Sequence, residues 1–153
     1  MYIHQRMSTP SSPASAIPCA CTALRKAARS VARLYDEALK PAGMTAGQLA
    51  ILRTIARAGE APLSDLARTL VMDRTSLYRA VAPLMARGWV TVAAGRGRAK
   101  QACLTAAGEA AAEAAAPGWE AAQARFITAF GVEPTLELHA MLASVAAVAQ
   151  DLS

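Results

Sequence analysis

Apolar residues recur at intervals of three and four along most of the chain, which is the spacing of one face of an amphipathic helix. The first such stretch spans residues 19–39 and ends before a proline and a glycine. A second stretch begins at Thr45, where Gln48 three residues later completes a capping box. The spacing returns near the C-terminus, in a helix whose first turn holds Pro134. The pattern therefore predicts a mainly helical protein.

Two predicted helices lie close together in the middle of the chain. A short helix runs from Pro62 through Leu70, with Ser64 as its predicted cap. After a turn at residues 71–72, Asp73 caps a longer helix that begins with polar and basic residues. A short helix, a tight turn and a longer helix form the layout of a helix-turn-helix.

A predicted hairpin follows directly. Residues 89–92 alternate between apolar and polar as a strand does, residues 95–98 supply glycine and arginine for a turn, and residues 101–104 can return as a second strand. Thr105 then precedes an alanine-rich helix that reaches about Phe130, in which the internal proline predicts a kink. The predicted fold class is mainly α with a small β-wing: a winged helix-turn-helix over residues 42–105.

The flanking segments differ in composition. Residues 1–18 mix proline and serine with little to bury, so we expect a disordered tail. Residues 19–41 and 106–153 are expected to be helical. No run of apolar residues matches a membrane span or a secretory signal, so we expect a cytoplasmic protein that does not contact a membrane.

Positive charge is concentrated in the middle of the chain. The formal net charge is +5, yet residues 42–105 carry nine basic side chains and three acidic ones. A polyanion would be attracted to this segment. The alternative is a basic face that is merely solvated.

The outward face of the helix after Asp73 has the chemistry needed to read DNA. Arginine can hydrogen-bond to guanine edges, whereas serine, threonine and tyrosine suit phosphates or thymine methyl groups. Arg96 and Arg98 at the hairpin tip could enter a minor groove, and Lys100 could meet phosphate. The alternatives are an ordinary amphipathic helix and an ordinary soluble hairpin. The predicted DNA-binding residues are Ser64, Arg74, Thr75, Ser76, Tyr78, Arg79, Arg96, Arg98 and Lys100.

With these motifs in place, the chain from about Leu24 to Trp119 resembles the multiple-antibiotic-resistance regulator (MarR) family of winged-helix repressors. The motifs that carry the resemblance are Leu63-Ser64-Asp65-Leu66-Ala67, Met72-Asp73-Arg74-Thr75-Ser76-Leu77-Tyr78-Arg79, Pro83-Leu84, Arg87-Gly88-Trp89-Val90 and Leu104-Thr105-Ala106-Ala107-Gly108. The resemblance implies a sequence-specific regulator of transcription, a repressor released by a small ligand or by oxidation. It also implies a homodimer on a palindromic operator in double-stranded DNA, with residues 19–41 and 106–153 forming the dimerisation region.

The wing departs from the family pattern at one position. Members commonly carry an acidic residue two places before the tip arginine, and here Arg96 stands two places before Arg98. We therefore expect a more mobile, more cationic wing, and a DNA affinity that falls more steeply with salt by about one unit of slope for each added phosphate contact.

Two features could carry a regulatory signal. Cys19 and Cys21 at the start of the first helix could sense oxidants or capture a metal between subunits, although small cysteines are more commonly inert. Trp119 could line a cleft that accepts a small aromatic acid, as the resemblance implies, with Arg25 or Arg29 meeting its carboxylate. The alternative is a packed interface tryptophan beside solvent-facing arginines.

Enzymatic chemistry has little support. The two histidines, His4 and His139, lie far apart in different segments, and no nucleophile elbow, metal-ligand pair or phosphate-binding glycine loop is present. We expect no enzyme activity and no cofactor or metal. The competing class is a winged helix that binds another protein, as an anti-repressor or adaptor, without binding DNA. That use predicts a neutral face on the helix after Asp73, and the observed face is basic.

Overall fold

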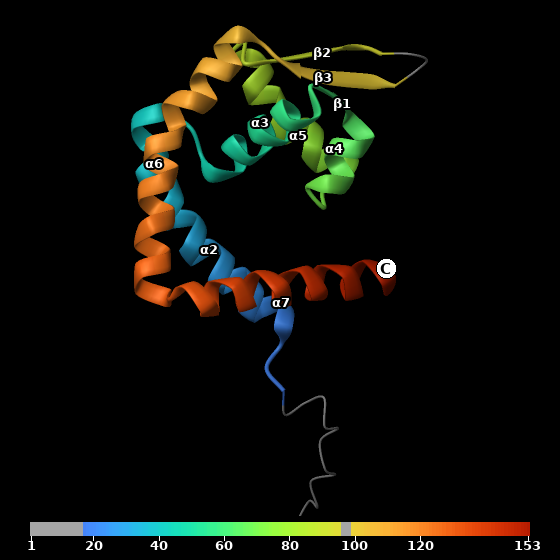
Figure 1. The fold of residues 1–153 in the computed structure, drawn as a ribbon. Helices are drawn as coiled ribbons and strands as arrows, with labels where there is room; N and C mark the ends of the chain where they lie inside the picture. Colours follow the sequence, from blue (N-terminus) through green and yellow to red (C-terminus); the bar gives the residue numbers. More distant parts are fainter. Residues whose placement is uncertain (1–16, 96–98) are drawn as a thin grey trace, which may run out of the picture. The chain divides into compact units, whose positions relative to one another are not determined.

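The protein, described here from a computed structural model covering residues 17–95 and 99–153, is mainly helical with one small sheet, as the sequence predicts (Figure 1). Its chain divides into two compact units, with the boundary between Arg33 and Leu34 inside α2. The elements in chain order are α2 (Ala20–Leu39), η1 (Lys40–Ala42), α3 (Ala46–Ala58), β1 (Glu60–Pro62), α4 (Leu63–Thr69), α5 (Arg74–Ala86), β2 (Val90–Ala94), β3 (Lys100–Leu104), α6 (Ala106–Phe130) and α7 (Val132–Asp151).

The sheet has three antiparallel strands in the order β1-β3-β2. In the hairpin, Val90 faces Leu104 and Ala94 faces Lys100, so both strands extend one or two residues nearer the tip than the sequence pattern indicates. On its other edge β3 pairs with β1, where Glu60 faces Cys103. The predicted hairpin is present, and the strand β1 is an addition to it.

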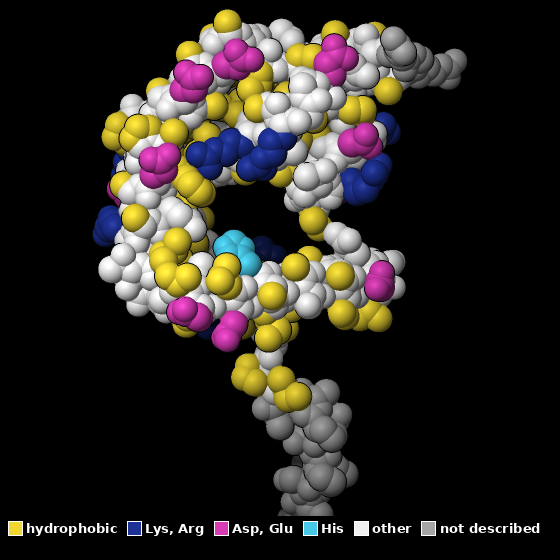
Figure 2. Space-filling view, viewed as in Figure 1, with side chains coloured by type: hydrophobic (Ala, Val, Ile, Leu, Met, Phe, Trp, Pro, Cys, Tyr) yellow, Lys and Arg dark blue, Asp and Glu magenta, His cyan; other side chains and the backbone are white. Residues whose placement is uncertain are grey.

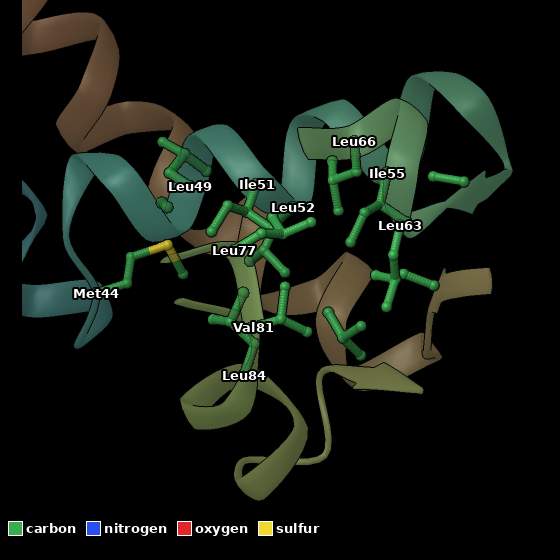
Figure 3. Close-up of a cluster of buried hydrophobic side chains, with 14 of the residues drawn as sticks. Met44, Leu49, Ile51, Leu52, Ile55, Leu63, Leu66, Leu77, Val81 and Leu84 are labelled. Carbon is green, nitrogen blue, oxygen red and sulfur yellow. The ribbon is translucent and has the colours of Figure 1, made fainter. Parts of the chain in front are cut away.

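Helices α3, α4 and α5 enclose one apolar core. Their buried side chains point toward one another between the helices (Figure 3), and Leu52, Ile55, Leu77 and Leu84 are fully buried. Each fully buried aliphatic side chain contributes about 1.5–3 kcal/mol relative to exposure to water. This core fixes the angle between α4 and α5, and thereby the position of the first turn of α5.

The start of α3 is fixed by two sets of hydrogen bonds. The capping box is present: the backbone N–H of Gln48 donates to Thr45 Oγ1 at 3.2 Å, and the N–H of Thr45 donates to Gln48 Oε1 at 3.0 Å. Asp36 in the last part of α2 also accepts from the N–H of Ala46 at 2.7 Å. The predicted cap is confirmed, and Asp36 adds a link to α2 that the sequence pattern does not reveal.

The start of α4 differs from the prediction. The helix begins at Leu63 with Pro62 at the cap position and no side-chain cap, so the expectation that Ser64 caps it is wrong. The cause is β1, because pairing of Pro62 with Gln101 ends the strand there and the helix starts at once. Ser64 consequently lies inside the first turn of α4, with its side chain exposed.

The start of α6 is fastened to the segment between α5 and β2. Thr105 Oγ1 donates to the carbonyl of Gly88 at 2.6 Å and also accepts from the N–H of Gly108 at 3.1 Å, while the N–H of Thr105 donates to the carbonyl of Trp89 at 3.1 Å. A Cβ on Gly108 would lie 2.0 Å from the Trp89 carbonyl oxygen, so only glycine fits there. The Thr105 to Gly108 motif therefore has a structural role: it holds the start of α6 against Gly88 and Trp89.

Beyond these contacts α6 runs as one helix from Ala106 to Phe130 with Pro117 inside it. The helix is not interrupted at this proline, since residues on both sides of it keep helical backbone, and the predicted kink stays a prediction. Pro117 itself is exposed, so its ring does not displace any core side chain. The next residue, Gly118, lets α6 approach the end of α2, because a Cβ there would lie 2.4 Å from the carbonyl oxygen of Ala38.

The turn between α4 and α5 contains a strained residue. Val71 has φ of +51° and is 61% exposed. It occupies the C′ position of a Schellman motif, since the N–H of Met72 donates to the Ala67 carbonyl at 2.9 Å and the N–H of Val71 donates to the Arg68 carbonyl at 3.2 Å. Glycine is usual at this position because the left-handed conformation is unfavourable for a side chain with a branched Cβ.

Replacing Val71 by glycine should therefore stabilise the protein. The left-handed conformation costs a residue with a Cβ about 1–2 kcal/mol, and part of that gain is offset by the greater unfolded-state entropy of glycine. We expect the free energy of unfolding, measured by urea denaturation, to rise by about 1 kcal/mol in Val71→Gly. Val71→Ala, which keeps a Cβ, should change it much less. A Val71→Gly protein less stable than the parent would contradict the strain.

Candidate nucleic-acid interface

The first turn of α5 is organised by Asp73. Its Oδ1 accepts from the N–H of Ser76 at 2.8 Å and its Oδ2 accepts from Ser76 Oγ at 2.5 Å. The predicted cap is confirmed. These bonds from the Ser76 side chain and backbone hold the pKa of the Asp73 carboxyl below its ordinary value. Since the Ser76 hydroxyl proton is donated to Asp73, Ser76 serves the cap in this structure, and its predicted contact with DNA would require that bond to open.

The lowered pKa of Asp73 makes the cap dependent on pH. A carboxyl whose pKa is lower in the folded state stabilises the fold above its ordinary value of 3.8, and this contribution disappears as the pH falls through the lowered pKa. In Ser76→Ala the main cause is removed, so the pKa of Asp73 should rise toward that ordinary value. A carboxyl ¹³C NMR titration of the two proteins measures the difference. Identical titration curves for Asp73 would contradict this assignment.

The two faces of α5 have different environments. Leu77, Val81 and Leu84 are buried against the core. Arg74, Thr75, Tyr78 and Arg79 are exposed, as the sequence pattern predicts. These four exposed side chains belong to the first two turns of the helix. This is the part of a recognition helix that approaches base edges in a major groove.

A shallow groove brings residues from three elements together beside this face. It has a volume of about 340 Å³ and is lined by Ser64 of α4, Arg74 and Tyr78 of α5, and Lys100 of β3. Four of the nine predicted DNA-binding residues thus share one surface. Arg96 and Arg98, predicted for the wing tip, lie outside the described residues, and their prediction is untested.

Within the described residues, the cations of this surface form no ion pair. Among residues 17–95 and 99–153, the ion pairs within 4 Å join Lys40 to Glu37 and Arg68 to Asp65. Both pairs are exposed and contribute little stability. Arg74, Arg79 and Lys100 take part in neither pair, so their charges remain available to an external anion.

Arg87 supports the end of α5, a role that the sequence pattern does not reveal. Its Nη1 donates to the carbonyl of Gly43 at 2.5 Å, and its guanidinium carbon lies 4.2 Å from the centre of the Trp89 ring. The signal in the sequence is Arg87 two residues before a tryptophan. The acceptor Gly43, however, lies 44 residues earlier, and only the fold brings it near.

A second cavity surrounds Trp119 on α6. It has a volume of about 210 Å³ and is lined by α3 residues that include Arg53, Thr54 and Arg57. The guanidinium carbon of Arg53 lies 4.2 Å from the centre of the Trp119 ring, a distance typical of cation–π attraction. Arg53 and Arg57 are not among the residues predicted from sequence, although their spacing of four places them on one face of a helix.

The other predicted regulatory residues lie in the N-terminal unit. Arg25 and Arg29 are exposed on α2. Cys19 and Cys21 are exposed free thiols at the start of the same helix. Hydrogen bonds from the backbone and side chain of Thr22 lower the pKa of the Cys19 thiol. Each of these residues is accessible to small reagents, and their regulatory roles remain predictions.

A helix-turn-helix with an exposed polar and basic second helix, followed at once by an antiparallel hairpin, defines a winged helix-turn-helix protein. The MarR family profile matches residues 42–100, which span that unit. Together with the structural similarity below, this shows that the chain belongs to the MarR family of transcriptional regulators.

Solved structures of transcriptional regulators share the fold over nearly their whole length. The M. tuberculosis transcriptional regulator MosR in complex with DNA is 34% identical, with 88% of this chain and 98% of that chain covered and a TM-score of 0.80. A probable transcriptional regulator from Pseudomonas aeruginosa is 25% identical, with 84% and 97% covered and a TM-score of 0.74. A cysteine-to-serine mutant of E. coli MarR complexed with operator DNA is 22% identical, with 88% and 99% covered and a TM-score of 0.76, and shows similarity of fold alone. No curated protein sequence matches the chain at a significant level.

Proposed function

We propose that this protein is a cytoplasmic transcriptional regulator that binds a specific palindromic site in double-stranded DNA as a homodimer. The observation that carries the proposal is the exposed face of α5, where Arg74, Thr75, Tyr78 and Arg79 project from the first two turns above a buried apolar face. An α-helix fits the major groove, and arginine can form paired hydrogen bonds with guanine there. The free cations in the groove beside α5 supply contacts to phosphate.

Footprinting tests the proposal directly. Genomic fragments retained by the purified protein are sequenced, and each enriched site is footprinted together with the region upstream of the protein's own gene. We expect protection of two half-sites with centres about one helical turn apart, because two recognition helices related by a dyad enter successive major grooves. Absence of preference for any duplex at low ionic strength would contradict the proposal and favour a module that binds another protein.

The proposed homodimer is supported by the apolar face of α7. Met141, Leu142, Val145 and Val148 are exposed along one side of this helix. Figure 2 shows hydrophobic side chains exposed on the surface along α7. Apolar surface of this extent on a terminal helix is typical of an interface between subunits.

The composition of α7 also allows a second interpretation. By length and mean hydropathy of 1.2, Val132–Asp151 is long and apolar enough to cross a membrane, and only 6% of that stretch is buried. The helix nevertheless carries Glu133 and Glu137, and carboxylates are costly in a lipid interior. We therefore assign the apolar face to a second copy of the chain.

The Trp119 cavity is the proposed receptor for a small aromatic acid that releases the regulator, acting as a repressor, from DNA. The cavity joins an indole ring to two guanidinium groups, those of Arg53 and Arg57. A guanidinium can bind a carboxylate through two parallel hydrogen bonds, and the indole can stack on an aromatic ring. Arg25 and Arg29, the carboxylate partners predicted from sequence, are replaced in this proposal by Arg53, because Arg53 already contacts Trp119.

Tryptophan fluorescence tests this receptor. Titration with benzoate should quench emission in the parent protein and in Trp89→Phe, and should leave Trp119→Phe unchanged. The same titration should lower DNA affinity in the parent and leave it unaltered in Arg53→Ala. Equal quenching in Trp119→Phe would place the ligand elsewhere.

Oxidation of Cys19 and Cys21 is the second proposed release signal. A lowered thiol pKa raises the fraction of reactive thiolate, and both thiols are exposed. Mild peroxide should reduce DNA affinity in the parent and leave a Cys19→Ser, Cys21→Ser protein unaffected. An equal loss of DNA affinity in both proteins would show that these cysteines do not carry the signal. If zinc changes the DNA affinity of both proteins equally, the cysteines do not form a metal site.

A further inference from the structure

Tyr78 of α5 and Lys100 of β3 contact each other in the groove beside α5. Tyr78 lies in the second turn of α5, and Lys100 is the first residue of β3, where it pairs with Ala94 at the tip end of the hairpin. The Lys100 Nζ lies 5.7 Å from the centre of the Tyr78 ring. A lysine ammonium is attracted to the negative face of an aromatic ring within about 6 Å.

Among the described residues, no anion competes with the Tyr78 ring for Lys100. The groove formed by Ser64, Arg74, Tyr78 and Lys100 has no acidic residue in its lining. Neither of the ion pairs found in the described ranges includes Lys100. The ring of Tyr78, which is 40% exposed, is therefore the attractive partner that the protein itself offers this ammonium.

We infer that Lys100 is a positioning residue for Tyr78: it holds the phenol ring in one orientation and so joins the tip end of strand β3 to α5. This inference rests on the proposed function, in which α5 faces DNA. An exposed tyrosine on a helix surface otherwise has more than one rotamer open to it, and ordering it at the moment of binding costs affinity. Orientation by Lys100 removes part of that cost before DNA arrives.

The inference changes the role of Lys100. As an independent phosphate contact, as predicted from sequence, Lys100 would contribute the same affinity whatever stands at position 78. As a positioning residue it contributes affinity through the ring and loses that contribution when the ring is removed. The two roles are separated by a double-mutant cycle.

The cycle compares the parent, Lys100→Gln, Tyr78→Leu and the double variant, by fluorescence anisotropy on the duplex that the parent selects. Lys100→Gln should weaken specific binding about 2- to 5-fold in the parent background, which corresponds to an exposed cation–π contact. It should have no effect in the Tyr78→Leu background, and Lys100→Arg should restore most of the affinity. Lys40→Gln, which removes an ammonium on η1, controls for loss of charge alone.

Equal losses in both backgrounds, with a salt slope shallower by about one unit, would identify an independent phosphate contact and overturn the inference. A measurement on the DNA-free protein keeps it separate from the proposed function. The ε-methylene protons of Lys100 should be shifted upfield in NMR spectra by the ring of Tyr78, and the shift should vanish in Tyr78→Leu. Absence of the shift in the parent would overturn the inference, whereas absence of duplex binding by the parent would overturn the proposed function.

Discussion

Glutamate at Met141 and Val145 should convert the protein to a monomer and reduce its specific DNA affinity about 100-fold or more. Both side chains are exposed on the apolar face of α7, one helical turn apart. In a dimer each charge would be buried against the partner without a counter-ion, which is strongly unfavourable. A monomer carries a single winged helix-turn-helix unit, so it loses the affinity that a dimer gains by binding two half-sites at once.

The matched control places two glutamates on the opposite side of the same helix. Ala143 and Ala147 are exposed and also one turn apart, and they lie away from the apolar face. The Ala143→Glu, Ala147→Glu protein should remain a dimer with parental affinity. Molecular mass by light scattering and affinity by anisotropy are measured on all three proteins. A dimeric Met141→Glu, Val145→Glu protein would show that α7 does not hold the subunits together.

Removal of Arg74 and Arg79 should abolish preference for the selected site. A good arginine contact to a base is worth about 1–3 kcal/mol, so the double alanine variant should bind the specific duplex about 100-fold or more weakly. Binding to unrelated duplex should fall less, because the remaining phosphate contacts carry that mode. The ratio of specific to non-specific affinity is therefore the quantity to measure.

A matched loss of charge elsewhere separates contact from long-range attraction. Arg33 and Arg125 are exposed and belong to neither the α5 face nor the groove beside it. The Arg33→Ala, Arg125→Ala protein has the same net charge as the test variant and should keep its preference for the selected site. If both double variants lose the same affinity on both duplexes, α5 contributes only its charge and does not read sequence.

The parts of this fold that could be predicted are those set by neighbouring residues. The Thr45 and Gln48 capping box and the Asp73 cap each depend on side chains three positions apart, and the structure has both. The buried and exposed faces of α5 follow from helical spacing alone. Local rules therefore located α5 and its cap correctly.

Features that depend on distant partners could not be found in this way. Strand β1 has three residues and exists because Glu60 to Pro62 pair with β3, about 40 residues later. That pairing also explains the error at Ser64, since it fixes where α4 begins. Helix α6 continues through Pro117, which lies on its exposed side, and the kink predicted there stays a prediction.

The candidate site shows the same division. The exposed positions of Arg74, Thr75, Tyr78 and Arg79 follow from sequence, because each depends only on the phase of one helix. The donation from Ser76 to Asp73 could be recognised only with side-chain geometry in hand. The contact of Arg53 with Trp119 joins α3 to α6, and no spacing rule connects residues so far apart.

The first turn of α6 is held against the segment before β2 by the contacts of Thr105 and Gly108 with the carbonyls of Gly88 and Trp89. The helix should therefore move with the base of the wing as one rigid rod. A helix of 25 residues is about 37 Å long. If its first turn is clamped to the base of the wing, a tilt of about 5° moves its far end by about 3 Å. A change of a few degrees at the wing would therefore displace the end of α6 near Phe130 by about 3 Å, and a displacement there would tilt the wing in return.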